Sequence, residues 1–489
     1  MPEQLLLTSG LFIGAPLAAL VIINLLSRRL ADKFCFGFSL AVPLLQMLAA
    51  AGCLAVLLTS GEDFIEFSLF WDHLAQYGAA YFRVDWLSLV ILFTIGLVSF
   101  AAILVGRRTI KTTRASFCSL VMVAILGMNG IAMVTDLFSL FIYLAITGIA
   151  TAALIAIRCD SRRLEGAFKY LLMNVVGSVF LLIGLALIFL EIGSLSFDIL
   201  AEYLVNWRAA GQPLLMLGLV FLVAGIAIKA ALAPFHSWLP DVYQGAPSAV
   251  ALFLLAIVTK AGGIYLIMRL FYSVFTAMDS MRIIFSLLAL VSIIYGAVAS
   301  FGQNDIKRLL AYSSISQLGY IVLGAASGSF LGILGAALHF FNHAVFKTTL
   351  FVNTLAVEEQ VGHSKLDGLG GLQARMPVTG ISSVLASLSA AGIPPLAGFW
   401  SKLIIIIAVW QQGQPIFAGL ALTASLLTAA YFLRLQRQVF FGKLPAKFNE
   451  VQEAKGSLYW LTLVFSLITV GLGLAFPLLL LHIQAWGLL

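Results

Sequence analysis

The sequence predicts an all-α polytopic membrane protein of about fourteen transmembrane helices, with two inverted five-helix repeats and two broken helices. Of its 489 residues, 62% are hydrophobic and 10% are charged, whereas a soluble domain is about 45–50% apolar and about 25% charged. Apolar stretches long enough to cross a hydrocarbon core, about 20 residues each, follow one another along the chain. Lys and Arg gather in alternate loops between them, as they do in membrane proteins.

Fourteen apolar stretches can be delimited, and short loops connect them. They lie near residues 5–27, 35–60, 86–106, 115–134, 137–157, 167–190, 213–240, 245–271, 283–302, 309–327, 330–356, 378–410, 415–433 and 457–481. The longest connections, at 61–85, 191–212, 357–377 and 434–456, are too short for a folded domain outside the membrane. The first stretch follows no basic region and precedes no small-residue cleavage site, so we expect a retained span rather than a signal peptide.

The positions of Lys and Arg predict the orientation. The loops after odd-numbered spans carry nineteen of these residues, and the loops on the other side carry only Arg83, Arg208, Arg269 and Arg282. Because cytoplasmic loops are enriched in Lys and Arg, we expect insertion in the cell (inner or cytoplasmic) membrane with both termini on the outer side. The formal charge of +7 therefore needs no nucleic-acid partner.

The chain offers no site for intrinsic catalysis. Its four cysteines, Cys35, Cys53, Cys118 and Cys159, form no CxxC pair, so neither an iron–sulfur cluster nor a thiolate zinc site is expected. No phosphate-binding glycine loop, no Ser/His/Asp set and no quinone, flavin or nicotinamide site is readable. We expect no metal and no cofactor in this chain, and any redox chemistry would take place in another subunit.

Four lysines lie deep within predicted spans and are the strongest functional signal: Lys229, Lys260, Lys347 and Lys402. A lysine at the bilayer centre costs about 3 kcal/mol on insertion scales, so charged residues there usually serve ion or proton movement. The alternative is that long stems carry the amine to the membrane surface, and for Lys260 and Lys347 it is the less favoured interpretation. The depth of Lys229 and Lys402 is harder to place because their spans are irregular.

Two spans are predicted to be broken helices. The stretch 213–240 is about 42 Å long as a straight helix, which exceeds the hydrocarbon core, and it contains Pro234. The stretch 378–410 is longer and contains Pro394 and Pro395. Proline removes a backbone donor and interrupts a helix, although a proline kink with a packing role alone would look the same. Breaks at matching positions beside ionisable residues are typical of inverted repeats around an ion path.

The stretch 330–356 places His339, His343 and Lys347 four residues apart. Such residues drift by only about 40° per step and share one face of a helix. A neutral imidazole can both donate and accept a hydrogen bond, so histidines beside a lysine suit proton transfer, whereas a single buried histidine would more often be a packing residue. His236 lies near one end of the first broken span, where it is either a proton-entry group or an interfacial side chain.

Four segments match a known family in order along the chain. They are KAALAPFHSWLPDVYQGAPSAVALFLLAIVTKAGG, DIKRLLAYSSISQLGY, HFFNHAVFKTTLF and GIPPLAGFWSK. Together they closely resemble the antiporter-like membrane subunits that respiratory complex I (NADH:quinone oxidoreductase), Mrp-type sodium/proton antiporters and energy-converting membrane hydrogenases share. The resemblance runs from FRVDWLSL near residue 82 to the thirteenth span. It does not decide which complex hosts the chain.

The resemblance implies a fourteen-helix, proton-conducting membrane transporter subunit. It implies N-terminal helices over 1–113, a first inverted repeat over 114–271, a second over 281–437 and a C-terminal helix over 438–489. The expected proton-translocating residues are Lys229, Lys260, His339, His343, Lys347 and Lys402. The chain would belong to an ion-translocating oxidoreductase or antiporter complex, with lipid and other membrane subunits, most plausibly another antiporter-like subunit, as partners.

One position departs from the family pattern. In DLFSLFIYLAITG the family would have a glutamate nine residues after the Asp, and this chain has Ala145. An acid of a neighbouring subunit, Asp136 or Glu165 could substitute for it, or Lys229 could rest uncharged. Alternatively the chain no longer pumps and is a structural or coupling subunit. A stand-alone solute carrier fits the cationic interior less well, because no carboxylate is expected at mid-membrane.

Overall fold

The computed structural model describes residues 3–67, 82–157, 161–205, 212–275 and 278–485. The chain forms two compact units. The first unit comprises Met1–Ala231 and Gly245–Met278, and the second comprises Leu232–Gln244 and Asp279–Leu489. The segment Leu232–Gln244, which contains Pro234 of the first predicted helix break, therefore belongs to the second unit. The chain returns to the first unit at Gly245.

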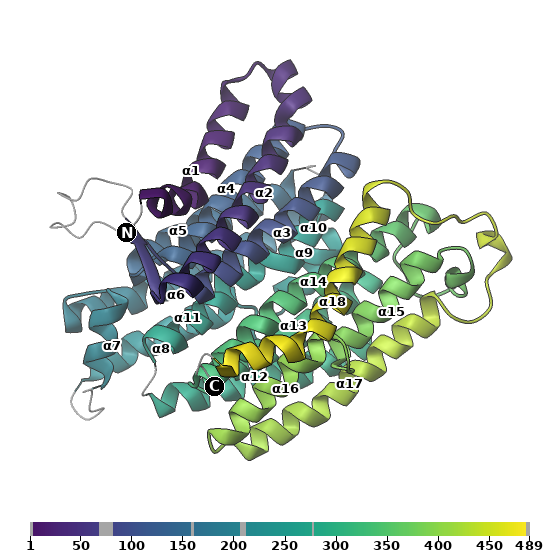
Figure 1. Cartoon of the computed structure of the whole chain (residues 1–489). Helices are drawn as coiled ribbons and strands as arrows, with labels where there is room; N and C mark the ends of the chain where they lie inside the picture. Colours follow the sequence, from purple (N-terminus) through teal and green to yellow (C-terminus); the bar gives the residue numbers. More distant parts are fainter. Residues whose placement is uncertain (1–2, 68–81, 158–160, 206–211, 276–277, 486–489) are drawn as a thin grey trace. The chain divides into compact units, whose positions relative to one another are not determined.

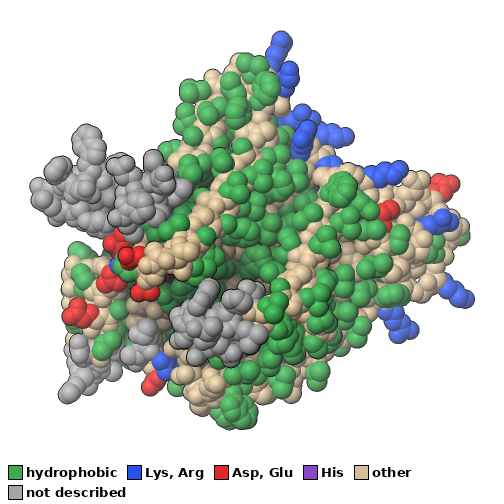
Figure 2. Space-filling model, viewed as in Figure 1, with side chains coloured by type: hydrophobic (Ala, Val, Ile, Leu, Met, Phe, Trp, Pro, Cys, Tyr) green, Lys and Arg blue, Asp and Glu red, His purple; other side chains and the backbone are tan. Residues whose placement is uncertain are grey.

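The prediction of a polytopic helical membrane protein is confirmed. Eleven helices in the described part of the chain are long and apolar enough to cross a membrane, and four shorter apolar helices accompany them. Large hydrophobic side chains are exposed along several helices, among them Leu48, Leu190 and Leu426, and Figure 2 shows hydrophobic side chains over wide areas of the surface. Helices that expose such side chains along their length are stable only against lipid or against another membrane subunit.

The first unit is helical apart from one short hairpin, in which β1 pairs antiparallel with β2 and Phe64 lies opposite Asp85. Its elements are α1 (Glu3–Leu25), α2 (Arg28–Ser60), β1 (Phe64–Phe67), β2 (Phe82–Asp85), α3 (Trp86–Thr109), α4 (Arg114–Met133), α5 (Leu137–Ala156), α6 (Ser161–Ile192), α7 (Phe197–Val205), α8 (Pro213–Lys229), α10 (Ser248–Phe253), the π-helical turns η2 (Leu254–Val258) and η3 (Lys260–Ile264), and α11 (Tyr265–Ser273).

The core of the first unit is the continuous span from α10 to α11, of which 94% is buried, whereas only 28% of the apolar window of α6 is buried. Glycines bring α6 and α8 close together (Figure 1). A Cβ at Gly184 would lie 2.8 Å from the carbonyl oxygen of Gly218, and a Cβ at Gly225 would lie 2.8 Å from that of Gly177. Small residues at such positions let two membrane helices approach backbone to backbone.

The second unit packs its helices around α13 and α14. Its elements are α9 (Trp238–Gly245, whose last residue lies in the first unit), α12 (Asp279–Phe301), α13 (Ile306–Ala326), α14 (Phe330–Val361), η4 (Leu372–Ala374), α15 (Pro377–Ala391), α16 (Ala397–Gln411), α17 (Pro415–Val439), η5 (Ala446–Phe448) and α18 (Ser457–Ala485). The apolar window of α13 is 94% buried. A Cβ at Gly296 of α12 would lie 2.5 Å from the backbone nitrogen of Ser316, so these two helices also meet at a glycine.

Both long irregular spans contain a break in the helix. The helix α8 ends at Lys229, Ala231 adopts a left-handed conformation with φ of 52°, and α9 begins at Trp238. The helix α15 ends at Ala391, Gly392 has φ of 82°, and α16 begins at Ala397. A helix that ends leaves its last carbonyl groups without helical partners, so each break places free backbone acceptors close to a lysine.

Several helices extend beyond the apolar stretches that predicted them. The stretch near 167–190 lies within α6, which starts at Ser161, and the stretch near 330–356 lies within α14, which continues to Val361. Hydrophobicity marks the part of a helix that faces hydrocarbon, whereas the helix itself continues through its polar ends until a capping residue stops it. In α14 that residue is Gly362, which has φ of 89°.

Candidate functional site

The structure buries Lys229 against α6. Only 8% of this residue is exposed, and its Nζ donates a hydrogen bond of 2.7 Å to Oδ1 of Asn174. Gly177, one turn further along α6, lies close enough that a Cβ there would come within 3.3 Å of Cγ of Lys229. The helix α6 therefore provides both the polar partner of this lysine and the space for its stem.

The neighbouring helix α5 contributes no charge, because no Asp, Glu, Lys or Arg occurs between Leu137 and Ala156. Asp136 caps α5 and accepts a hydrogen bond of 2.7 Å from the backbone nitrogen of Ser139. Glu165 pairs with Lys169 at 2.8 Å on the exposed part of α6. A role of Asp136 or Glu165 as the substitute acid for Lys229 stays a prediction.

Lys260 is the first residue of η3 and is completely buried. The π-helical turn brings its backbone against the break that follows α8, since a Cβ at Gly263 would lie 2.4 Å from Cα of Ala230. The apolar stretch 245–271 gave no sign of these π-helical turns. Single π-helical turns are rare and frequently occur at functional sites, and two of them, η2 and η3, flank Thr259.

In the second unit, His339, His343 and Lys347 lie fully buried along α14. Nδ1 of His339 lies 2.9 Å from Oγ of Ser401, and its Nε2 lies 3.2 Å from Oε1 of Gln317. Nζ of Lys347 donates to Oγ of Ser313 and, at 2.9 Å, to the carbonyl oxygen of Leu310. These partners come from α13 and α16, and all of them are uncharged.

Lys402 lies in α16, just beyond the second break. Only 3% of the residue is exposed, and its Nζ donates a hydrogen bond of 2.8 Å to the carbonyl oxygen of Ala390. The same ammonium group lies 4.3 Å from the centre of the Tyr320 ring. The acceptor is one of the carbonyl groups that the end of α15 leaves free. Pro394 and Pro395 lie in the break itself.

His236 lies in the second unit, in the irregular segment that also contains Pro234. Its ring centre is 4.4 Å from that of Tyr295 and 6.4 Å from that of Tyr312, and 8% of the residue is exposed. The histidine is thus enclosed by aromatic rings of α12 and α13. This setting is compatible with both roles that the sequence left open, entry of a proton and packing.

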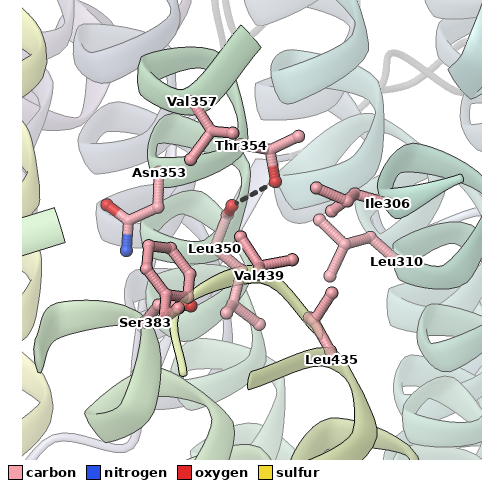
Figure 3. A pocket seen from close by; sticks show the side chains of 10 residues that line it. Ile306, Leu310, Leu350, Asn353, Thr354, Val357, Ser383, Leu435 and Val439 are labelled. Carbon is pink, nitrogen blue, oxygen red and sulfur yellow. Dashed lines mark hydrogen bonds between the residues drawn. The ribbon is translucent and has the colours of Figure 1, made fainter. Parts of the chain in front are cut away.

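A pocket opens beside α14, one to three turns beyond Lys347 (Figure 3). Its lining comprises Ile306, Leu310, Leu350, Asn353, Thr354, Val357, Ser383, Leu435, Val439 and Phe440. Oγ1 of Thr354 donates to the carbonyl oxygen of Leu350 at 2.7 Å, as the dashed line in Figure 3 marks. Leu310 links the pocket to the lysine, since its side chain lines the pocket and its carbonyl oxygen accepts from Nζ of Lys347.

The structure contains a buried ion pair between Asp85 and Arg269 that was not predicted from the sequence. Nη1 of Arg269 lies 2.5 Å from Oδ2 of Asp85, and both side chains are less than a tenth exposed. Burial by itself raises the pKa of Asp85, but the guanidinium group and the backbone N–H of Ser88 outweigh burial and hold this pKa below its usual value. Arg269 had been counted among the loop residues, whereas it lies inside the buried span next to Tyr265.

Four uncharged partners of the buried lysines and of His339 were also not predicted from the sequence: Asn174, Ser313, Gln317 and Ser401. A polar residue within an apolar span can indicate a functional site, but Asn, Ser and Gln occur in many spans without a functional role. In the part of the chain that the structure describes, no three His, Cys, Asp or Glu side chains gather as a metal site would require.

The sequence and the fold both match known membrane proteins. The family model described as NADH:quinone oxidoreductase/Mrp antiporter, TM, matches residues 134–428. The NADH-quinone oxidoreductase subunit N of Desulforudis audaxviator is 34% identical over 425 residues, which cover 85% of this chain and 83% of that protein. The match therefore extends over most of both sequences and includes the segments that contain the buried lysines.

Two solved structures have the same fold. A chain of the Mrp complex from Dietzia sp. DQ12-45-1b superimposes with a TM-score of 0.87 at 24% identity, over 98% of this chain and 96% of that one. A chain of respiratory complex I from Thermus thermophilus superimposes with a TM-score of 0.76 at 28% identity, over 97% of this chain and 98% of that one. Both comparisons include nearly all of each chain.

Proposed function

This chain belongs to the NADH:quinone oxidoreductase/Mrp antiporter family of membrane subunits, and we propose that it translocates protons. The carrying groups are Lys229 and Lys260 in the first unit and His339, His343, Lys347 and Lys402 in the second. The observation that supports this most strongly is the burial of four lysines in apolar spans, each with at most 8% of its surface exposed. Positions that are so costly to charge are usually retained for ion movement.

The chemistry of the surrounding groups suits protons. Burial disfavours a charged amine, so a lysine can release its proton when a neighbouring charge moves. Ser313 and Gln317 present a hydroxyl and an amide beside Lys347 and His339, and such groups can accept or donate a hydrogen bond. Sodium, which favours several oxygen ligands, is the less suitable ion at these amines, although sodium/proton exchange in the whole complex is compatible with the proposal.

We infer that the chain crosses the cell membrane fourteen times. The eleven long spans, α1 and the two interrupted pairs α8/α9 and α15/α16 would together make this number. The positive loops would face the cytoplasm, both termini would lie outside, and α4–α11 and α12–α17 would be the two inverted repeats. We propose that the chain functions beside other membrane subunits, among them another antiporter-like subunit, and that it holds no cofactor of its own.

The test is proton translocation by the parent complex in sealed vesicles, with a pH-sensitive dye as the readout. Lys229→Ala and Lys402→Ala are expected to reduce translocation at least tenfold while the complex still assembles. Lys111→Ala, which removes an exposed lysine from the loop between α3 and α4, is the matched control and is expected to change nothing. Normal translocation by both Lys229→Ala and Lys402→Ala would exclude the proposal.

A second candidate function is a coupling subunit that transports nothing. One observation favours it: the position of the family glutamate is Ala145, and the described partner of Lys229 is an uncharged amide. This candidate predicts that all four lysine-to-alanine variants pump normally, whereas deletion of the chain abolishes assembly of the complex. The same vesicle assay therefore separates the two functions.

A further inference from the structure

The side chain of Asn174, on α6, lies close to both α5 and α8. Glycines let α6 approach α8 closely at Gly177 and Gly225, one turn from Asn174 and one turn from Lys229 respectively. On the opposite side, α5 has a glycine at 148, where a Cβ would lie 2.0 Å from Nδ2 of the Asn174 side chain. The amide therefore fills a space that exists only because Gly148 has no side chain.

The surroundings of Lys229 are nearly free of charge. The helix α5 contains no ionisable side chain except Tyr143, and α6 has only Tyr170 near this level, with Glu165 and Lys169 paired to each other further along the helix. The turn η3, whose Gly263 touches Ala230, contributes Lys260. The helix α6 also carries Arg162 and Arg163 in its first turn and Glu191 next to its last residue. Between these two ends, the packed elements offer two tyrosines, a second lysine and a self-paired couple.

We propose that Asn174 is the positioning residue for Lys229, and that its amide oxygen takes the place of the carboxylate that the family pattern has at position 145. The proposal rests on the proposed proton translocation and deepens it. In this chain Lys229 is held by a partner that carries no charge and lies on α6 rather than on α5.

The exchange of a carboxylate for an amide changes which protonation states of Lys229 its partner can stabilise. An amide oxygen accepts a hydrogen bond from an ammonium group and from a neutral amine alike. A carboxylate within about 4–6 Å instead favours the charged form of its partner strongly. Asn174 therefore keeps Lys229 in place in both protonation states, and no anion in the described part of the first unit has to be displaced for the proton to leave.

The pH profile of translocation by the reconstituted complex tests this role. Asn174→Asp places an anion at the lysine, so the profile is expected to move about 1–3 pH units to higher pH. Asn174→Leu removes the acceptor and leaves the ammonium group unsatisfied, so the profile is expected to move about 1 pH unit to lower pH. Asn24→Asp, the same chemical change on α1, where Asn24 contacts Ser119, is the control and leaves the profile unchanged.

Gly148→Ala covers the case in which substitutions at Asn174 prevent assembly. It leaves the amide in the chain but displaces it from the lysine, so a shift to lower pH is again expected. Gly52→Ala on α2, where a Cβ would meet nothing within 4 Å, is its matched control. A residue with a packing role alone would lower the amount of complex but would not move the profile.

Failure of the positioning role and failure of the proposed function are distinguishable. If Lys229→Ala stops translocation while the profiles of Asn174→Asp and Gly148→Ala overlay that of the unmodified complex, the role of Asn174 is wrong and the proposed function stands. If Lys229→Ala translocates normally, the proposed function itself fails. Shifts in opposite directions for Asn174→Asp and Asn174→Leu would establish the positioning role.

Discussion

The two units provide a buried lysine with different kinds of hydrogen-bond acceptor. In each, a lysine lies buried beside a break in a helix. Lys229 donates to the side chain of Asn174, whereas Lys402 donates to the backbone carbonyl group of Ala390 and faces the ring of Tyr320. A side-chain acceptor can be changed by one substitution, but a backbone acceptor is fixed by where the helix ends. The chemistry of the first site is therefore open to adjustment by sequence, and that of the second is set by the fold.

The largest effect is expected from breaking the ion pair that fixes the helix after Lys260. Arg269→Leu leaves the carboxylate of Asp85 buried and unpaired, which is expected to cost about 3–5 kcal/mol of stability. The effect is measured by heating the purified complex and recording the temperature at which this subunit is lost from it. The comparison in the second unit is Glu358→Gln, which weakens the partly exposed pair with Lys307 and should cost about 1 kcal/mol or less. Equal losses would show that the buried pair has no special role.

The next effect concerns the backbone acceptor of the second unit. A Cβ at Gly398 would lie 1.9 Å from the carbonyl oxygen of Ser389, so Gly398→Ala must push α16 away from the end of α15. We expect a cost of about 1–3 kcal/mol and a loss of translocation. Gly419→Ala on α17, where a Cβ meets nothing within 4 Å, is the control. Unchanged translocation by Gly398→Ala would mean that the position of Ala390 does not matter to Lys402.

A smaller effect is expected at the aromatic ring beside Lys402. Tyr320→Leu removes the ring, whose attraction to a cation is worth about 0.5–2 kcal/mol, so translocation should fall by less than in Lys402→Ala. Tyr320→Phe keeps the ring and loses only the hydroxyl group that donates to the carbonyl oxygen of Ala421. Initial translocation rates of the two variants in vesicles separate the effects. A loss in Tyr320→Phe as large as that in Tyr320→Leu would assign the role to the hydroxyl group.

The smallest effect is expected at His339. Ser401→Ala removes the hydroxyl group that lies 2.9 Å from Nδ1, and a single hydrogen bond contributes about 0.5–1.5 kcal/mol. We expect a few-fold slower translocation at unchanged assembly. Ser425→Ala, at an exposed hydroxyl group on α17, is the control. If Ser401→Ala is as severe as Lys347→Ala, this hydroxyl group is itself an obligatory step of the path.

The sequence predicted the features that depend on one segment at a time. Apolar length located the spans, and span length with Pro234, Pro394 and Pro395 pointed to the two interrupted helices. The burial of Lys260 and Lys347 follows from their place in apolar runs. Each of these inferences needs only the period of a helix and the thickness of a membrane.

The features that the sequence left out depend on contacts between distant segments. Asp85 and Arg269 are 184 residues apart, and the arginine, which lies close to the end of the predicted span 245–271, was counted with the loop residues. Asn174 could be matched to Lys229 only once the glycines of α6 and α8 were known to meet. The π-helical turns around Lys260 have no composition that distinguishes them from an ordinary helix.

These π-helical turns have a geometric consequence. A π turn contains about one residue more than an α turn, and one residue corresponds to a rotation of about 100° around an α-helix. Conversion of η3 to α geometry would therefore turn the residues on one side of it by that angle relative to those on the other. Because Lys260 is the first residue of η3, such a conversion would change the direction of its side chain relative to Tyr265 and the rest of α11.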